Sequence, residues 1–79
     1  MVTKRGFDEL REAILHNLAS GRKTANQIAS ETGIGWKTVS KHLVYLAGLE
    51  LIRLSFSNSY FKIFELSDKG KEKIGVGEV

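Results

Sequence analysis

The stretch Gln27–Leu46, which reads QIASETGIGWKTVSKHLVYL, decides the fold. Its apolar residues recur at helical spacing on both sides of a glycine. Before that glycine, Ile28, Ala29 and Thr32 form the apolar edge of a short helix. Gly33 stands where the end of a helix favours a positive φ, a conformation that costs glycine little. The pattern therefore predicts two helices joined by a tight turn.

The second helix of this pair carries an apolar and a polar stripe. Steps of three and four residues define the stripe that is expected to be buried: Trp36, Val39, Leu43, Leu46 and Ala47. The opposite stripe carries Lys37, Thr38, Lys41 and Tyr45. Since the major groove of B-DNA is about 12 Å wide and admits one helix, a helix pair of this kind is suited to reading DNA.

The longer run TGIGWKTVSKHLVYLAGLELIR, residues 32–53, resembles the helix-turn-helix and following strand of winged-helix transcription regulators. It is most similar to the arsenic-repressor-like and multiple-antibiotic-resistance-repressor-like groups and to small winged-helix proteins of archaea and their viruses. Residues 38–43 match the core of that pattern, 47–49 its exit and 65–70 the end of the wing. The resemblance covers residues 7–74. It implies an α+β winged helix-turn-helix fold, with a three-helix core, a two- to three-stranded β-wing and a short C-terminal helix.

Length and composition limit the classes of function. The chain has 79 residues, which is enough for one domain with one core. We therefore expect a single winged-helix domain over residues 1–79, with a flexible basic lead-in at 1–6 and a flexible tail at 75–79. The absence of cysteine from the sequence excludes disulfides and thiolate metal ligands. No apolar run approaches the roughly 18 residues of a membrane span, so we expect no membrane partner and a cytoplasmic location, or the host-cell cytoplasm for a viral protein.

The distribution of charge favours a polyanionic partner more strongly than the formal net charge of +3 does. Between Thr32 and Phe64 the only acidic residue is Glu50. The basic residues in that segment are Lys37, Lys41, Arg53 and Lys62. The segment is expected to form a basic surface. The alternative is that such a gap in acidic residues arises by chance in a small domain.

The residues before the helix pair predict another helix and a short link. Phe7, Leu10, Ile14 and Leu18 recur at steps of three and four, so we expect a first helix that ends at 19–21. The link at 22–24 is extended, and in the family that the chain resembles it often pairs with the wing. Either Thr24 or Asn26 is expected to cap the second helix.

The residues after the helix pair predict a hairpin and a final helix. Ile52, Leu54 and Phe56 alternate with other residues and are expected to share one face of a half-buried strand. A turn follows at 57–59, and the partner strand is expected over 60–66. Its core-facing members are expected to be Phe64 and Leu66, and the last helix to run from a cap at 67–68 through 74.

The resemblance also implies a set of DNA-contacting residues. In the recognition helix, about residues 36–47, these are Trp36, Lys37, Thr38, Ser40, Lys41 and Tyr45. In and beside the wing tip at 57–60, which would reach the phosphate backbone or the minor groove, they are Arg53, Ser57, Asn58, Ser59, Tyr60 and Lys62. Each of the two lysines of the helix would contact either guanine or phosphate.

Five positions have a second interpretation, depart from the family pattern or are assigned no contact. Trp36 is expected to be half core and half contact, and the alternative for Ser40 is a bond to the carbonyl of the preceding turn. Gly35 stands where many relatives have a Ser or Thr cap and supplies no side-chain oxygen. His42 lies beside the apolar stripe and is interpreted as a packed or surface residue, and His16 as facing solvent.

Together these features predict a sequence-specific double-stranded DNA-binding transcription regulator that represses by occupancy. We expect a homodimer, because a single module of this kind covers only about 600–1,000 Å². The first helix, the tail or the outer wing face would form the dimer surface. The alternative is a protein-interaction module in a transcription or replication assembly, since Phe61 and Ile63 add apolar side chains to the wing. The sequence has no phosphate-binding glycine loop, and its two histidines form no catalytic or metal-ligand motif, so no enzyme, cofactor, metal site or small-molecule substrate is expected.

Overall fold

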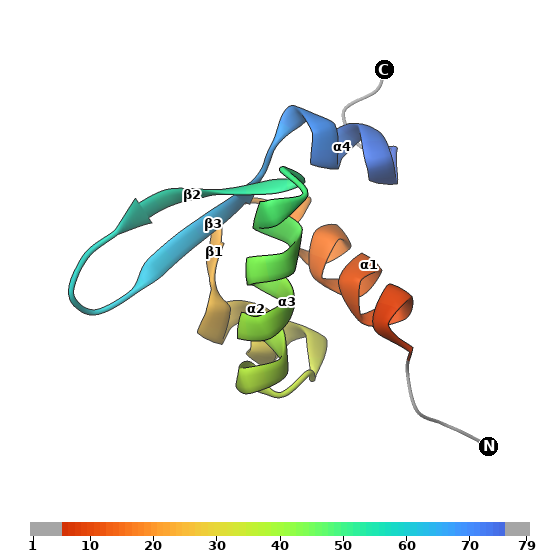
Figure 1. Cartoon of the computed structure of the whole chain (residues 1–79). Coiled ribbons are helices and arrows are strands. Elements are labelled where there is room, and N and C mark those ends of the chain that lie inside the picture. The colour runs from red at the N-terminus through yellow and green to blue at the C-terminus, as the bar shows by residue number, and fades with distance from the viewer. Residues whose placement is uncertain (1–5, 76–79) are drawn as a thin grey trace.

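The computed structural model describes residues 6–75, which form helices packed against a small antiparallel sheet (Figure 1). The elements follow in the order α1 (Phe7–Leu18), β1 (Lys23–Thr24), α2 (Ala25–Thr32), α3 (Trp36–Gly48), β2 (Ile52–Ser57), β3 (Lys62–Leu66) and α4 (Asp68–Ile74). The hairpin of β2 and β3 extends away from the helices as a wing (Figure 1). The expected lead-in and tail lie outside the described residues, except for Gly6 and Gly75. The predicted α+β winged helix with a C-terminal helix is confirmed.

The helix pair α2 and α3 is held by local hydrogen bonds. Thr24 caps α2: its Oγ1 accepts from Gln27 N at 3.1 Å, and Gln27 Oε1 accepts from Thr24 N at 3.0 Å. Such a reciprocal cap satisfies amide groups that the first turn leaves free. Gly33 ends α2 with φ 76°, and its N–H donates to Ala29 O at 3.0 Å. The predicted cap and the predicted turn glycine are therefore confirmed.

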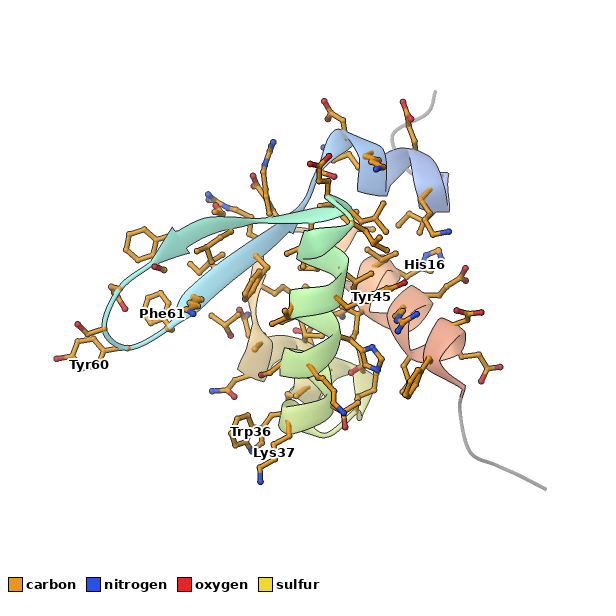
Figure 2. The ribbon with its side chains drawn as sticks, viewed as in Figure 1. His16, Trp36, Lys37, Tyr45, Tyr60 and Phe61 are labelled. Atoms are coloured by element: carbon orange, nitrogen blue, oxygen red, sulfur yellow. The ribbon has the colours of Figure 1, made fainter. Side chains whose placement is uncertain are left out.

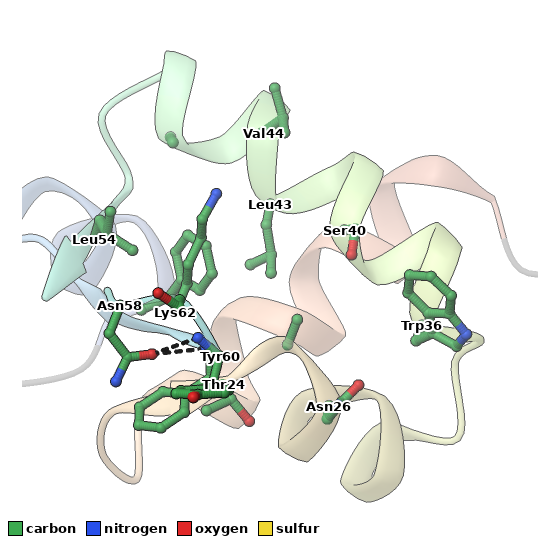
Figure 3. A pocket seen from close by; sticks show the side chains of 15 residues that line it. Thr24, Asn26, Trp36, Ser40, Leu43, Val44, Leu54, Asn58, Tyr60 and Lys62 are labelled. Carbon is green, nitrogen blue, oxygen red and sulfur yellow. Dashed lines mark hydrogen bonds between the residues drawn. The ribbon is translucent and has the colours of Figure 1, made fainter. Parts of the chain in front are cut away.

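The apolar stripe of α3 is narrower than the sequence predicted. Val39, Leu43 and Leu46 are buried in the core as expected. Ala47 is exposed, so its predicted burial was wrong, whereas Trp36 is 59% exposed, which fits the expectation that it is only partly in the core. Both residues lie on the flank of α3 that faces the wing, and the wing does not close over that flank (Figure 3).

The first helix occupies the predicted residues and buries three apolar side chains in the core. Ile14 and Leu18 are in the core, together with Leu15, which the three-and-four spacing omitted. Phe7 lies in the first turn of α1, beyond the core, and stays exposed. Since α1 packs against α2, α3, β3 and α4, it needs a wider apolar surface than a single stripe supplies.

The sheet has the order β1-β3-β2, and both pairings are antiparallel. Lys23 lies opposite Phe64, which confirms that the link pairs with the wing. Between Leu54 and Phe56 the register shifts by one residue, which is a β-bulge at Ser55.

The bulge and the length of the wing overturn part of the predicted strand pattern. Ile52 is buried, but Leu54 and Phe56 are about half exposed, so the expectation of one shared buried face was wrong. The bulge breaks the alternation of the strand. In addition, the outer half of the hairpin, toward the wing tip, extends past the core (Figure 1). The partner strand begins at Lys62, not at residue 60, because the two preceding residues belong to the turn. Leu66 is buried and Phe64 packs against the core, as predicted.

The final helix is docked on the loop that follows α3. Ser67 Oγ accepts from Gly70 N at 3.0 Å and donates to Glu50 O at 2.6 Å, while Ser67 N donates to Leu51 O at 3.0 Å. Gly70 itself is buried, and a Cβ there would collide with the Leu51 carbonyl. Residues 6–75 contain no helix with the length and apolar character needed to cross a bilayer.

Candidate nucleic-acid interface

The outward face of α3 is open and basic. Lys37, Lys41 and Val44 recur at steps of four and three and lie opposite the buried stripe, and all three are exposed. Lys37 projects from the amino-terminal end of α3, which lies away from α4 (Figure 2). Among residues 6–75, no carboxylate lies within ion-pair distance of either lysine. Two free positive charges one helical turn apart can therefore meet an anionic ligand.

The flank of α3 that faces α1 is occupied by a small cluster of side chains. The Arg11 guanidinium lies over the Tyr45 ring, 3.7 Å from its centroid, and Arg11 Nε donates to His42 Nδ1 at 3.3 Å. The Phe7 ring meets His42 edge to face at 5.2 Å. Tyr45 therefore has one ring face covered, and Thr38, seven residues earlier on the same flank, is half-buried. Of these two predicted contact residues, Tyr45 lies toward α1, away from Lys37 (Figure 2).

His42 is packed, as one of its two interpretations expected, and it is the buried titratable group of this cluster. It is 3% exposed. Burial lowers the pKa of His42 below its ordinary value because the charged ring would lose its hydration, and the charges of Arg11 and Lys41 lower it further. The bond from Arg11 requires a Nδ1 without a proton, which fits a neutral ring. His16, in contrast, is exposed on α1, as expected (Figure 2).

The other flank of α3 borders a groove of about 650 Å³ between this helix and the wing (Figure 3). From α3, Trp36 and Ser40 line it, and Asn26 lines it from α2. From the wing the lining includes Leu54, Asn58, Ser59, Tyr60, Phe61 and Lys62. Among residues 6–75, no acidic side chain lines the groove. The sequence prediction missed Asn26, Val44 and Leu54, because only the folding of the wing toward α2 and α3 brings these residues to one concave surface.

The wing tip is a structured turn. Asn58 N donates to Phe61 O at 3.0 Å, and Asn58 Oδ1 accepts from Tyr60 N at 2.8 Å and from Phe61 N at 3.0 Å (Figure 3). A side chain that bonds its own turn in this way fixes the backbone without help from other elements. Tyr60 is 90% exposed and stands at the tip, while Phe61 packs against Phe56 with ring centroids 5.9 Å apart (Figure 2). Ser57, Ser59 and Lys62 are exposed beside them.

Arg53 is separated from the other predicted site residues. It lies near the base of the hairpin, directly opposite Glu65, and its Nε is 2.7 Å from Glu65 Oε2. This hydrogen bond and the attraction of the carboxylate raise the pKa of Arg53 above its already high ordinary value. Its charge is therefore partly offset. This pairing was not predicted, because the segment of the sequence that is poor in acidic residues ends at Phe64, one residue before Glu65.

A basic residue that the prediction omitted lies on the wing side of the molecule. Arg22, in the link before β1, donates from Nη1 to Ser55 Oγ at 3.3 Å. Its guanidinium is thus held at the bulge, midway along β2, and it stays exposed. The predicted pairing of the link with the wing was the signal that would have found it.

The structure therefore places the amino-terminal end of α3 and the wing tip on two sides of one groove, and leaves Thr38, Tyr45 and Arg53 outside it. Among the described residues, no group of three or more His, Asp or Glu side chains is placed to hold a metal ion.

Comparison with known proteins gives a family match and several similar structures. A model of the bacterial regulatory proteins of the arsR family matches residues 8–53. A mutant of ZitR from Lactococcus lactis, in apo form, has a TM-score of 0.76 and 29% identity over 84% of this chain and 52% of that chain. Adhesin competence repressor (AdcR) from Streptococcus pyogenes has a TM-score of 0.77 and 22% identity over 84% of this chain and 51% of that chain.

A third similar structure is the homodimeric winged helix-turn-helix DNA-binding domain of Mb0332 from Mycobacterium bovis, a possible ArsR-family transcriptional regulator. Its TM-score is 0.77, with 21% identity over 87% of this chain and 64% of that chain. The present chain thus spans between about half and two thirds of the length of these proteins. At 21–22% identity, the likeness to Mb0332 and AdcR shows the fold alone. No curated protein sequence matches the chain.

Proposed function

The chain belongs to the arsR family of bacterial regulatory proteins, and from this we propose that it binds double-stranded DNA sequence-specifically and regulates transcription, as a repressor that occupies its operator in the cytoplasm. The observation that supports this most is the pair of free lysines, Lys37 and Lys41, on the outward face of a rigidly packed helix. The same face carries no acidic side chain between Gly35 and Leu49.

The geometry supports a docking mode with two points of contact. The amino-terminal end of α3 enters the major groove, where base edges present a distinct hydrogen-bond pattern for each base pair. Trp36, Lys37, Ser40 and Lys41 are then the contact residues of the helix. The wing tip, residues 57–60 together with Lys62, reaches the phosphate backbone or the adjoining minor groove. Arg53, Thr38 and Tyr45 are assigned secondary parts, because Arg53 is ion-paired, Tyr45 is covered by Arg11 and Thr38 is half-buried.

The proposal includes a homodimer on a near-palindromic operator. One such module covers only about 600–1,000 Å² of DNA, which limits specificity, and two recognition helices read half-sites about 34 Å apart. The homodimeric state of the Mb0332 domain supports this expectation. Light scattering during size-exclusion chromatography at tens of micromolar tests it, and a monomer throughout that range would reject it.

The test of the DNA-binding face is a charge-matched pair of double variants. Lys37→Ala/Lys41→Ala removes two charges from α3, whereas Lys69→Ala/Lys71→Ala removes two exposed charges from α4, on another side of the molecule (Figure 1). Operator DNA is first obtained by selection from a random duplex pool, which also reports palindromy and half-site spacing. Affinity is then measured by fluorescence anisotropy as a function of salt concentration.

The two variants have different expected outcomes. The α3 variant should lose about 2–4 kcal/mol of binding free energy. It should also reduce the slope of log K against log[salt] by roughly 1.8, which is two contacts at about 0.9 each. The α4 variant should keep most of the slope. If both variants bind like the wild type, or lose the same amount, the proposed face is wrong.

A second candidate function is that of a protein-interaction module. The observation that favours it is the apolar surface of the wing, where Phe56 and Phe61 are about half exposed. It predicts negligible affinity for any selected duplex at physiological salt and co-purification with a partner from a transcription or replication assembly. Recovery of a defined operator from the random pool would decide against it.

A further inference from the structure

The groove between α3 and the wing has an apolar surface that contacts with phosphates and base edges would not use. Tyr60 is 90% exposed and Val44 75% exposed, and Trp36, Leu54 and Phe61 are each about half exposed. All five line one concavity of about 650 Å³, a size typical of ligand sites, which range over roughly 300–1,000 Å³ (Figure 3). Contiguous exposed apolar surface of this kind marks a binding site more often than it marks ordinary solvent contact.

The aromatic rings of this groove stand at its two rims. Trp36 lies at the amino-terminal end of α3, and Tyr60 and Phe61 lie at the wing tip (Figure 2). Each ring presents a large flat surface from a fixed element, because α3 is anchored in the core and Asn58 ties the backbone of the turn by two hydrogen bonds. Such preorganisation lowers the entropy that a ligand must give up on binding.

The polar groups of the groove specify the charge of the ligand. Lys62 lines it, Lys37 projects beside Trp36 at its rim without lining it (Figure 2), and no acidic residue of the described part of the chain lines it. Among residues 6–75, neither lysine has a carboxylate partner. The Asn26 and Asn58 amides and the Ser40 hydroxyl add short donors and acceptors within the concavity. A purely apolar peptide would leave these charges without a counterpart, whereas a chain with flat bases and phosphates would use both features.

We propose that this groove binds single-stranded DNA, with unpaired bases stacked on Trp36 and Tyr60 and the intervening phosphates beside Lys37 and Lys62. Alternating aromatic and basic side chains of this type are the usual platform for single strands, because every base has a flat face and every linkage has a charge. In an intact duplex the base faces are covered by their neighbours and are inaccessible to the rings. The groove thus adds an activity beyond duplex recognition. Trp36, Tyr60 and Lys62 line the groove and also belong to the proposed duplex interface, so single-stranded and duplex DNA compete.

The test uses the single tryptophan of the chain as a reporter. The probes are a 12-nucleotide oligothymidylate and an abasic deoxyribose phosphate oligomer of the same length and charge. Stacking on Trp36 should quench its fluorescence with oligothymidylate, and oligothymidylate should bind at least about tenfold more tightly than the abasic oligomer. Equal affinity for the two probes, or binding without a change in tryptophan emission, would overturn the proposal.

A matched set of variants separates stacking on an aromatic ring from simple contact with a large apolar side chain. Tyr60→Phe keeps the ring and should bind oligothymidylate like the wild type, whereas Tyr60→Leu should bind about 5- to 150-fold more weakly. Trp36→Leu, measured with a labelled oligonucleotide, should show a loss in the same range. Circular dichroism checks that each variant is folded. If Tyr60→Leu binds as well as Tyr60→Phe, the rings are not the platform and the proposal fails.

The variant Lys41→Ala distinguishes this proposal from the proposed function. Lys41 points outward and does not line the groove, so its loss should weaken duplex binding and leave oligothymidylate binding unchanged. If the wild-type protein binds operator DNA but has equal affinity for oligothymidylate and the abasic oligomer, only the proposed single-strand site is refuted. If oligothymidylate binds the wild-type protein and quenches its tryptophan fluorescence, but selection from the duplex pool recovers no operator, only the proposed duplex function is refuted.

Discussion

Replacement of Gly70 by alanine tests how α4 is docked, because two physical effects act in opposite directions. Alanine is a better helix former than glycine by at most about 1 kcal/mol, so local propensity favours Gly70→Ala. A Cβ at this position, however, would collide with the carbonyl oxygen of Leu51, and it would lie 3.0 Å from the carbonyl carbon and 3.2 Å from Leu66 Cδ2. The contact is mainly with backbone, which cannot rotate away as a side chain can.

The Leu51 carbonyl cannot easily shift away from a Cβ at position 70. Leu51 is buried, its oxygen accepts from Ser67 N, and the preceding carbonyl of Glu50 accepts from Ser67 Oγ. Overpacking of this type costs about 1–3 kcal/mol. Loss of one of these hydrogen bonds adds about 0.5–1.5 kcal/mol. After the gain in helix propensity is subtracted, we expect Gly70→Ala to lower the free energy of unfolding by about 2 kcal/mol.

The assay is thermal and urea unfolding followed by circular dichroism. In a domain of this size 1 kcal/mol corresponds to about 4–8 °C, so Tm should fall by roughly 8–16 °C. The matched control is Gly48→Ala at the end of α3, where a Cβ meets nothing within 4 Å. There only the propensity effect operates, and Tm should stay the same or rise by a few degrees. If Gly70→Ala is as stable as the wild type, the close approach of α4 to Leu51 is not as the structure has it.

Three further changes have expected outcomes. Thr24→Ala removes the reciprocal cap of α2 and should cost about 1 kcal/mol in urea unfolding, whereas Thr24→Ser should keep most of it. Since burial lowers the pKa of His42, the unfolded chain binds this proton more readily than the folded chain, and stability should fall as pH drops from 6.5 toward the lower folded value. His42→Gln should flatten that part of the stability profile, and His16→Gln should not. Asn58→Ala loosens the wing turn, so anisotropy should show weaker operator binding while Tm changes little.

Features that depend on neighbours within three or four residues were predictable from the sequence. Gly33 takes the left-handed conformation at the end of α2, Thr24 caps the start of that helix, and Ser67 caps α4. In each case the group that forms the bond and the group that needs it are close along the chain, so the sequence alone contains the interaction. The bounds of the helices followed from these signals together with apolar periodicity.

Features that depend on which element covers a face were not predictable in the same way. Periodicity shows that Trp36 and Ala47 share a flank of α3 with each other, but not that the wing leaves this flank open. Phe56 was misplaced because the bulge at Ser55 changes the phase of the strand, and no residue type marks that bulge. The partners of candidate site residues were also missed where the contact is long-range, as with Arg53 and Glu65, 12 residues apart, and Arg11 and His42, 31 residues apart.

The three faces of α3 explain how one short helix serves the core and the interface together. Successive residues turn by about 100°, so burial of Val39, Leu43 and Leu46 fixes the rotation of the helix and therefore the direction in which Lys37 and Lys41 point. No loop or hinge intervenes between the buried and the free side chains. A core substitution such as Val39→Ala should thus alter DNA binding only through the folded fraction, with an unchanged salt slope, whereas a change on the outward face should alter the slope at constant stability.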